Sequence, residues 1–150
     1  MAFKLVVSLC SILFSASLFA FPCFFTLVKD NCWTNYDVKV DVIDTSTNKS
    51  VITVEVPKGK SWVRQSFSCE PAQKFLYKAS YQPVFWQSEV GKTYSSLRYW
   101  SLPASIGKGE TAWNIPVCFP AAFAEVPFPP DATTGNCECD FSRIPAPPPQ

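Results

Sequence analysis

The cysteines constrain this chain more than any other feature of its sequence. Cys10 lies in an apolar N-terminal segment, and six further cysteines follow at Cys23, Cys32, Cys69, Cys118, Cys137 and Cys139. An even number of cysteines in a short exported chain predicts a framework of up to three disulfides. Cys137 and Cys139 are too close in the sequence to bond each other without strain, so each should tie the C-terminal segment to an earlier part of the chain. We predict the pairs Cys32–Cys69, Cys118–Cys137 and Cys23–Cys139.

The N-terminus has the layout of a secretory signal peptide. A single positive charge at Lys4 precedes an apolar run from Leu5 to about Phe14, and small residues follow at Ser15–Ser17 and Ala20. This order predicts a signal peptide over residues 1–20, cleaved between positions 17 and 20. The alternative is an uncleaved membrane anchor extending to Phe25, which Pro22 and the small residues argue against. We therefore expect an exported chain, periplasmic or extracellular, with no membrane span after cleavage.

Charge and composition exclude several functions. The chain has 13 basic and 12 acidic residues, and removal of Lys4 leaves 13 − 1 = 12 basic residues. A neutral chain has no excess of positive charge to attract the phosphates of nucleic acid, so no nucleic-acid partner is expected. Histidine is absent, which removes the commonest general base and the commonest metal ligand. We predict no metal, no cofactor and no catalysis. Cys137-Glu138-Cys139 lacks the second ligand pair of a zinc site, although free or redox-active thiols remain an alternative to disulfides.

Short alternating segments separated by turns predict an all-β fold. Val38, Val40 and Val42 alternate with polar residues, as in a half-buried strand. Further strands are expected over residues 51–56, 62–67, 74–81, 84–88, 95–102 and 111–117. Strands of this number and spacing, joined by turns of irregular length, predict an antiparallel, immunoglobulin-like β-sandwich over residues 21–118.

Two segments of the chain echo one another. Lys58–Ser61 precedes Trp62 and a strand that ends at Cys69, and 108–111 precedes Trp113 and a strand that ends at Cys118. Two copies are too few to define a repeat. We interpret them as two similar turns of the sandwich.

Proline dominates the sequence after Val117. Residues 119–150 contain Pro120, Pro127, two adjacent prolines at 129–130 and four more over 145–149, which leaves no room for regular structure. We predict an extended arm that is held by Cys137 and Cys139, packs on the domain through Phe119, Phe123 and Phe128, and ends in a disordered tip. Such an arm can cover an exposed sheet edge.

Aromatic residues beside arginines are the candidate binding surface. Adjacent side chains of a strand point to opposite faces, so Phe85-Trp86 and Tyr99-Trp100 should each place one ring outward. Exposed aromatics serve protein interfaces or sugar stacking; burial of both faces by the second sheet or by the arm is the alternative. The interface candidates are Trp62, Arg64, Phe85, Trp86, Arg98, Tyr99 and Trp100.

Three segments carry a resemblance to a class of proteins: residues 21–30, residues 113–120 and Cys137-Glu138-Cys139-Asp140-Phe141. They resemble small exported proteins of gammaproteobacteria that live inside cells, some of which accompany the outer-membrane core of type IVB secretion machines. The resemblance implies a periplasmic location and a structural role in an envelope assembly, with no functional residue to transfer. We expect a non-catalytic protein-binding subunit; a carbohydrate-binding module using Trp86 or Trp100, and a secreted effector or inhibitor, are the alternatives.

Overall fold

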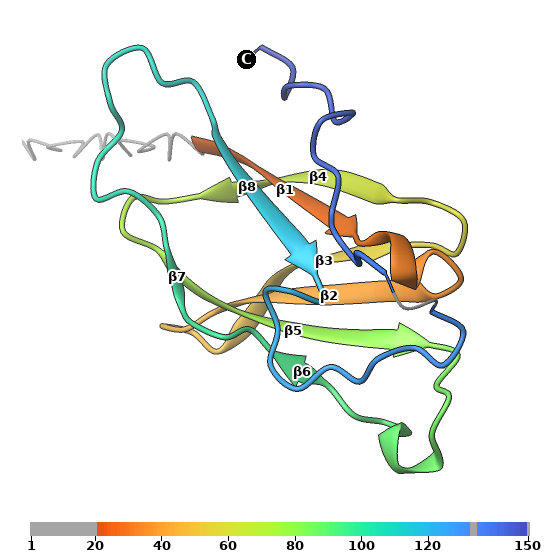
Figure 1. Cartoon of the computed structure of the whole chain (residues 1–150). Coiled ribbons are helices and arrows are strands. Elements are labelled where there is room, and N and C mark those ends of the chain that lie inside the picture. Colours follow the sequence, from red (N-terminus) through yellow and green to blue (C-terminus); the bar gives the residue numbers. More distant parts are fainter. Residues whose placement is uncertain (1–20, 133–134, 150) are drawn as a thin grey trace, which may run out of the picture.

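The computed structural model describes residues 21–132 and 135–149, and over them the chain is an all-β sandwich. Two sheets pack face to face around one hydrophobic core (Figure 1). The predicted β-sandwich is therefore confirmed. The predicted signal peptide, its cleavage site and Cys10 lie outside the described residues.

The first sheet has three strands in the order β4-β1-β8. They are β1 (Phe21–Lys29), β4 (Trp62–Cys69) and β8 (Trp113–Phe119). The central strand β1 is antiparallel to β4 and parallel to β8, while the other pairings among the described strands are antiparallel. The two echoed segments thus form the two neighbours of β1. Residues 23–29 of β1 are buried on both faces of the sheet, and such a strand reads as a continuous apolar run without alternation.

The second sheet has the order β3-β2-β5-β6, and β7 also pairs with β5. Its strands are β2 (Asp37–Asp44), β3 (Lys49–Val56), β5 (Lys74–Gln82), β6 (Tyr94–Ser95) and β7 (Trp100–Ser101). Val38, Val40 and Val42 are fully buried, as their alternation predicted. Together with β1 they build the core around Trp33, whose ring lies 4.8 Å from Tyr81 between ring centroids.

Two predicted strands are corrected by the structure. Residues 84–88 form a loop that leads into the short 3-10 helix η2 (Gln87–Glu89), since Pro83 has no N–H to continue the ladder of β5. Residues 95–102 are reduced to the two-residue strands β6 and β7. Directly after β6 the Ser96 N–H still donates to the Tyr77 carbonyl of β5 at 2.8 Å, while the Leu97 N–H points to the other side and donates to the Ala122 carbonyl at 2.9 Å.

The predicted disulfide pairing was wrong. The three bonds are Cys23–Cys69, Cys32–Cys137 and Cys118–Cys139. Cys69 ends β4 opposite Phe21 of β1, so the register of these two strands brings it to Cys23. The expectation that the two closely spaced C-terminal cysteines each tie the arm to an earlier element is confirmed.

The C-terminal arm lies against the first sheet (Figure 1). The Arg64 Nη2 donates to the Pro145 carbonyl at 2.8 Å, and its Nε donates to Thr26 Oγ1 at 2.9 Å. Near the start of the arm, the Tyr36 hydroxyl donates to Asp131 at 2.7 Å. Disorder of the tip beyond Pro145 stays a prediction.

The three phenylalanines that we expected to pack the arm on the domain do not behave alike. Phe119 still belongs to β8 and is fully buried, and Phe123 is buried as well. Phe128 is 58% exposed, so its predicted burial was wrong; it lies in a stretch without regular structure between Pro127 and Pro129. The arm is therefore packed on the core near its start, through Phe119 and Phe123, and is held further on by its disulfides and polar contacts.

Candidate functional site

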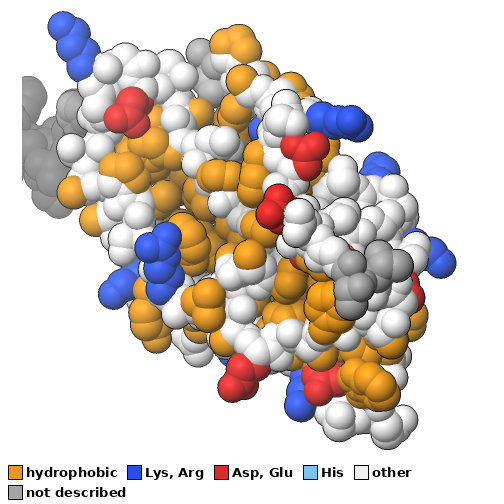
Figure 2. Space-filling model, in the orientation of Figure 1, with side chains coloured by type: hydrophobic (Ala, Val, Ile, Leu, Met, Phe, Trp, Pro, Cys, Tyr) orange, Lys and Arg blue, Asp and Glu red, His pale blue; other side chains and the backbone are white. Residues whose placement is uncertain are grey.

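An apolar groove follows β8 on the side away from β1. Among residues 21–132 and 135–149, β8 is the last strand of its sheet and no strand pairs with its outer edge. Two hollows of about 530 and 290 Å³ lie along this edge and share Trp100 and Pro116 in their walls. In Figure 2, hydrophobic side chains gather between β8 and the β6–β7 segment. We call this feature the β8 groove; its walls include Leu97, Arg98, Trp100, Leu102, Pro116 and Phe141.

Backbone hydrogen bonds show which groups of β8 face the groove. The Asp30 N–H donates to the Phe119 carbonyl at 2.9 Å, on the β1 side, whereas the Cys118 carbonyl accepts from the Ala122 N–H at 3.0 Å. Residues of a strand alternate in direction, so Asn114 and Pro116 present their backbone groups on the same side as Cys118. Pro116 therefore lacks its N–H on the outer edge, where proline is tolerated in a sheet.

The chain closes one end of the groove with its own backbone. After β8 it turns back, and the Ala122 carbonyl accepts from the Leu97 N–H at 2.9 Å. The Ala124 N–H donates to the Ser95 carbonyl at 2.9 Å. Residues 120–122 form a turn, in which the Phe123 N–H also donates to the Pro120 carbonyl at 2.9 Å, and Phe123 then forms an isolated antiparallel bridge with Ser96. Residues 121–124 thus link the edges of the two sheets. The groove is the part of the same gap that this segment leaves unfilled.

An aromatic stack forms the floor of the groove and holds two unsatisfied donors. Trp100 lies between the ring of Tyr77, stacked at 5.8 Å between centroids, and the guanidinium of Arg98, 4.0 Å from the Trp100 ring centroid. The Tyr77 hydroxyl and the Trp100 Nε1 are buried and have no hydrogen-bond partner among the described residues. Burial raises the pKa of Tyr77, although nearby Arg98 opposes the shift. The phenol therefore stays protonated and able to donate.

The structure separates the predicted interface residues into three places. Arg98 and Trp100 line the β8 groove. Trp86 and Tyr99 are 53% and 58% exposed outside it, and Lys74 Nζ lies 5.1 Å from the centroid of the Tyr99 ring. The remaining three are partly buried: Phe85 stacks on Tyr81, and Trp62 and Arg64 belong to β4, where Arg64 binds the arm.

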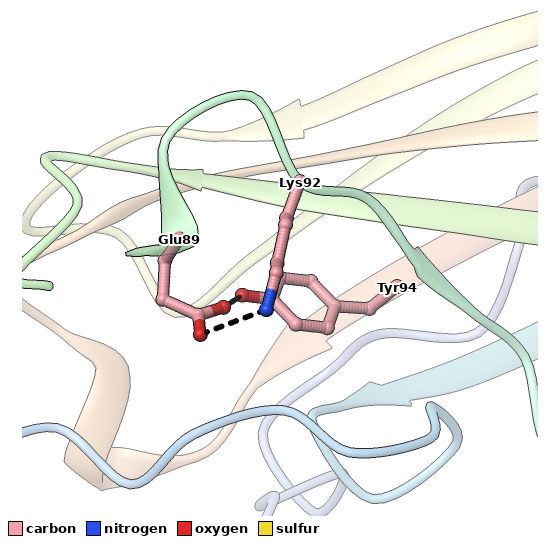
Figure 3. Close-up of polar contacts among 3 residues, drawn as sticks. All are labelled: Glu89, Lys92 and Tyr94. Carbon is pink, nitrogen blue, oxygen red and sulfur yellow. Dashed lines mark hydrogen bonds and ion pairs between the residues drawn. The ribbon is translucent and has the colours of Figure 1, made fainter. Parts of the chain in front are cut away.

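A polar cluster shapes the loop that exposes Trp86. Glu89 accepts hydrogen bonds from the Tyr94 hydroxyl and from Lys92 Nζ, the latter at 3.2 Å (Figure 3). The hydrogen bond from Tyr94 is the main cause that lowers the pKa of Glu89. Burial, followed by the same hydrogen bond, raises the pKa of Tyr94. The cluster fixes the loop next to β6, which leaves the Trp86 ring outside the core.

Several residues of the β8 groove could not be identified from the sequence. Leu97 is 66% exposed and Phe141 is 41% exposed at the rim of the groove, and neither stands in a recognisable pattern. Pro116 did carry a usable signal, because a proline inside a strand marks an edge strand. Tyr77 carried none, since its alternation in β5 predicts only a core position.

The other possible chemistry is sparse in the described part of the chain. All six cysteines there form disulfides, and no group of three or more acidic or cysteine side chains is placed to hold a metal ion. Over the same residues, no helix has the length and apolar character needed to cross a membrane. No protein-family model, curated protein or solved structure matches this chain. The groove must therefore be interpreted from its own geometry.

Proposed function

We propose that this chain is an exported, non-catalytic binding protein that docks onto another protein of the cell envelope. The observation that carries the proposal is the open β8 groove with exposed apolar side chains at its rim. Leu97 at 66% and Phe141 at 41% exposure flank a hollow of about 530 Å³. Contiguous exposed apolar surface next to a groove is typical of interaction sites. Three disulfides support an oxidising compartment outside the cytoplasm.

The resemblance to periplasmic proteins favours an accessory subunit of an envelope assembly, of the kind found with type IVB secretion machines. Such a role needs a stable docking platform and no reacting groups. The fully paired cysteines and the absence of histidine from the sequence agree with this role.

The test is site-specific photo-cross-linking in intact cells. A benzophenone amino acid is placed at Leu97 on the groove rim and, as a matched control, at Val51 of β3, which is 37% exposed on the other sheet. We expect one discrete envelope-protein adduct from position 97 and none from position 51. An uncross-linked monomer at both positions would contradict the proposal. Recovery of the chain from the culture supernatant would favour a secreted effector or inhibitor.

Carbohydrate binding is a second candidate because Trp86 leaves 53% of its surface exposed. A free indole face can stack on a sugar ring. Trp100 offers less, since Tyr77 and Arg98 occupy its two faces. Titration of the tryptophan fluorescence with soluble peptidoglycan fragments, on the native chain and on Trp86→Ala, separates the candidates. A saturable change that Trp86→Ala abolishes would support the sugar module, and a flat response would remove it.

A further inference from the structure

We infer that the β8 groove binds an extended, mainly apolar segment of a partner polypeptide, which pairs with the outer edge of β8 as an added strand. This inference rests on the proposed function and specifies its site and the chemistry of the partner. Strand addition combines main-chain hydrogen bonds along a sheet edge with pockets for alternate side chains. Both parts are present in the described structure.

The edge of β8 offers the main-chain part. Asn114 presents its N–H and its C=O away from β1, and Pro116 presents its C=O there, by the alternation established from Phe119 and Cys118. No described strand takes these groups. An incoming segment can thus form a short ladder of about three hydrogen bonds, interrupted at Pro116.

The chain's own closing segment shows what kind of molecule fits this gap. At its far end, after the turn at residues 120–122, Phe123 forms an antiparallel bridge with Ser96, in which the Leu97 N–H donates to the Ala122 carbonyl and the Ala124 N–H to the Ser95 carbonyl. The groove continues the gap beyond this bridge. A backbone that pairs as a strand therefore already lies at one border of the gap, and a partner strand can pair with the β8 border, whereas a sugar ring would leave the Asn114 and Pro116 backbone groups without a ladder.

The walls define the side chains of the partner. The groove is lined mostly by apolar and aromatic residues, with Arg98 as the charged residue in its two linings. This lining selects apolar side chains at alternate positions and one acidic residue facing Arg98.

A pair of variants at one position tests the main-chain part of the inference. Asn114→Pro removes the outward N–H, whereas Asn114→Ala keeps it; both remove the side chain that accepts from Thr26 Oγ1 at 3.3 Å. The full chain, exported and purified with its disulfides formed, is panned against a random nine-residue peptide library displayed on phage. We expect enriched peptides with apolar residues at alternate positions, binding Asn114→Pro at least tenfold more weakly than Asn114→Ala. Near-ultraviolet circular dichroism checks that both variants fold.

The outcomes separate this inference from the proposed function. A library that enriches no peptide, or only peptides that bind both variants equally, overturns strand addition at β8. If the position-97 cross-link to an envelope protein persists in that case, the docking function stands without it. Perturbation of the Trp100 indole N–H signal by peptidoglycan fragments, with no effect of peptide, would also overturn the inference in favour of a glycan.

Discussion

Lys29, a lysine buried beside the core, illustrates how one residue can make the free energy of unfolding depend on pH. Lys29 is 3% exposed, and its Nζ donates to the carbonyls of Tyr36 at 2.6 Å and Pro57 at 3.0 Å. Burial lowers the pKa of Lys29 to about 8, against the opposing effect of Asp37. The two carbonyls and the charge of Asp37 thus compensate the lost hydration of the ammonium only in part, because no carboxylate of the described residues forms an ion pair with it.

This lysine makes the free energy of unfolding rise with pH. Its folded pKa of about 8 lies below the ordinary lysine pKa of 10.5, so the unfolded chain binds more protons between these two values and stability increases as the pH rises through this window. The gain is at most about 3 kcal/mol. Above about pH 10 it is opposed by Tyr36, whose pKa burial raises to about 12. Urea unfolding from pH 7 to 10 measures the slope, which Lys29→Met should remove and the exposed-site control Lys39→Met should retain. A flat profile for the native chain would contradict the assignment.

The unsatisfied hydroxyl of Tyr77 gives a second prediction at the residue scale. Tyr77→Phe removes a buried donor without a described partner and keeps the ring packed on Trp100, so we expect unchanged or slightly higher stability, within about 1 kcal/mol. Tyr36→Phe is the matched control, because it loses a hydrogen bond to Asp131 and should be destabilised by about 1 kcal/mol. Thermal unfolding distinguishes the two. A larger loss for Tyr77→Phe would mean that the hydroxyl is satisfied in solution.

Strands β2 and β1 show which parts of the fold could and could not be predicted from the sequence. The alternation of Val38, Val40 and Val42 locates β2 because one face of that strand is solvated. Strand β1 could not be predicted, since burial of both faces removes the alternation and its apolar residues continue from the predicted signal segment. The pairing of Cys23 with Cys69 depends on the register of β1 against β4, which no local pattern encodes.

Two disulfides hold the C-terminal arm, and they should contribute unequally to the free energy of unfolding. Cys32–Cys137 spans 105 residues and ties the arm to η1 (Asn31–Trp33), whereas Cys118–Cys139 spans 21 residues. Replacing Cys32 and Cys137 together by Ala should cost about 2–4 kcal/mol and make the chain near Asp131 sensitive to limited proteolysis. The same double replacement at Cys23 and Cys69 is the comparison. Because these cysteines are 0% and 3% exposed in the core, it should cost more and leave the arm attached.

At the scale of the whole molecule, the two sides of the sandwich differ. On one side β3 and β4, which each end a sheet, lie in contact with each other, and the arm covers the outer face of the first sheet near Thr26 and Val28, both 1% exposed. The side between β8 and β7 is left with a groove. The sequence predicted the sandwich and an arm held by disulfides, and it indicated Arg98 and Trp100 as interface residues. It could not predict the groove, because that depends on how far residues 121–124 reach between the sheets.

An open edge in an exported protein also carries a risk of self-association, and Pro116 limits it. Its missing N–H breaks the outer ladder of β8 at mid-strand, as edge prolines do. Pro116→Val restores that N–H and adds a β-branched residue, while the bonds of β8 to β1 use the opposite side of the strand. We expect this variant to form β8-to-β8 dimers at concentrations where the native chain associates less, measured by sedimentation velocity. Pro116→Val combined with Asn114→Pro, which breaks the ladder again two residues away, should reverse the effect. Equal association of all three chains would mean that the backbone of β8 does not control access to the groove.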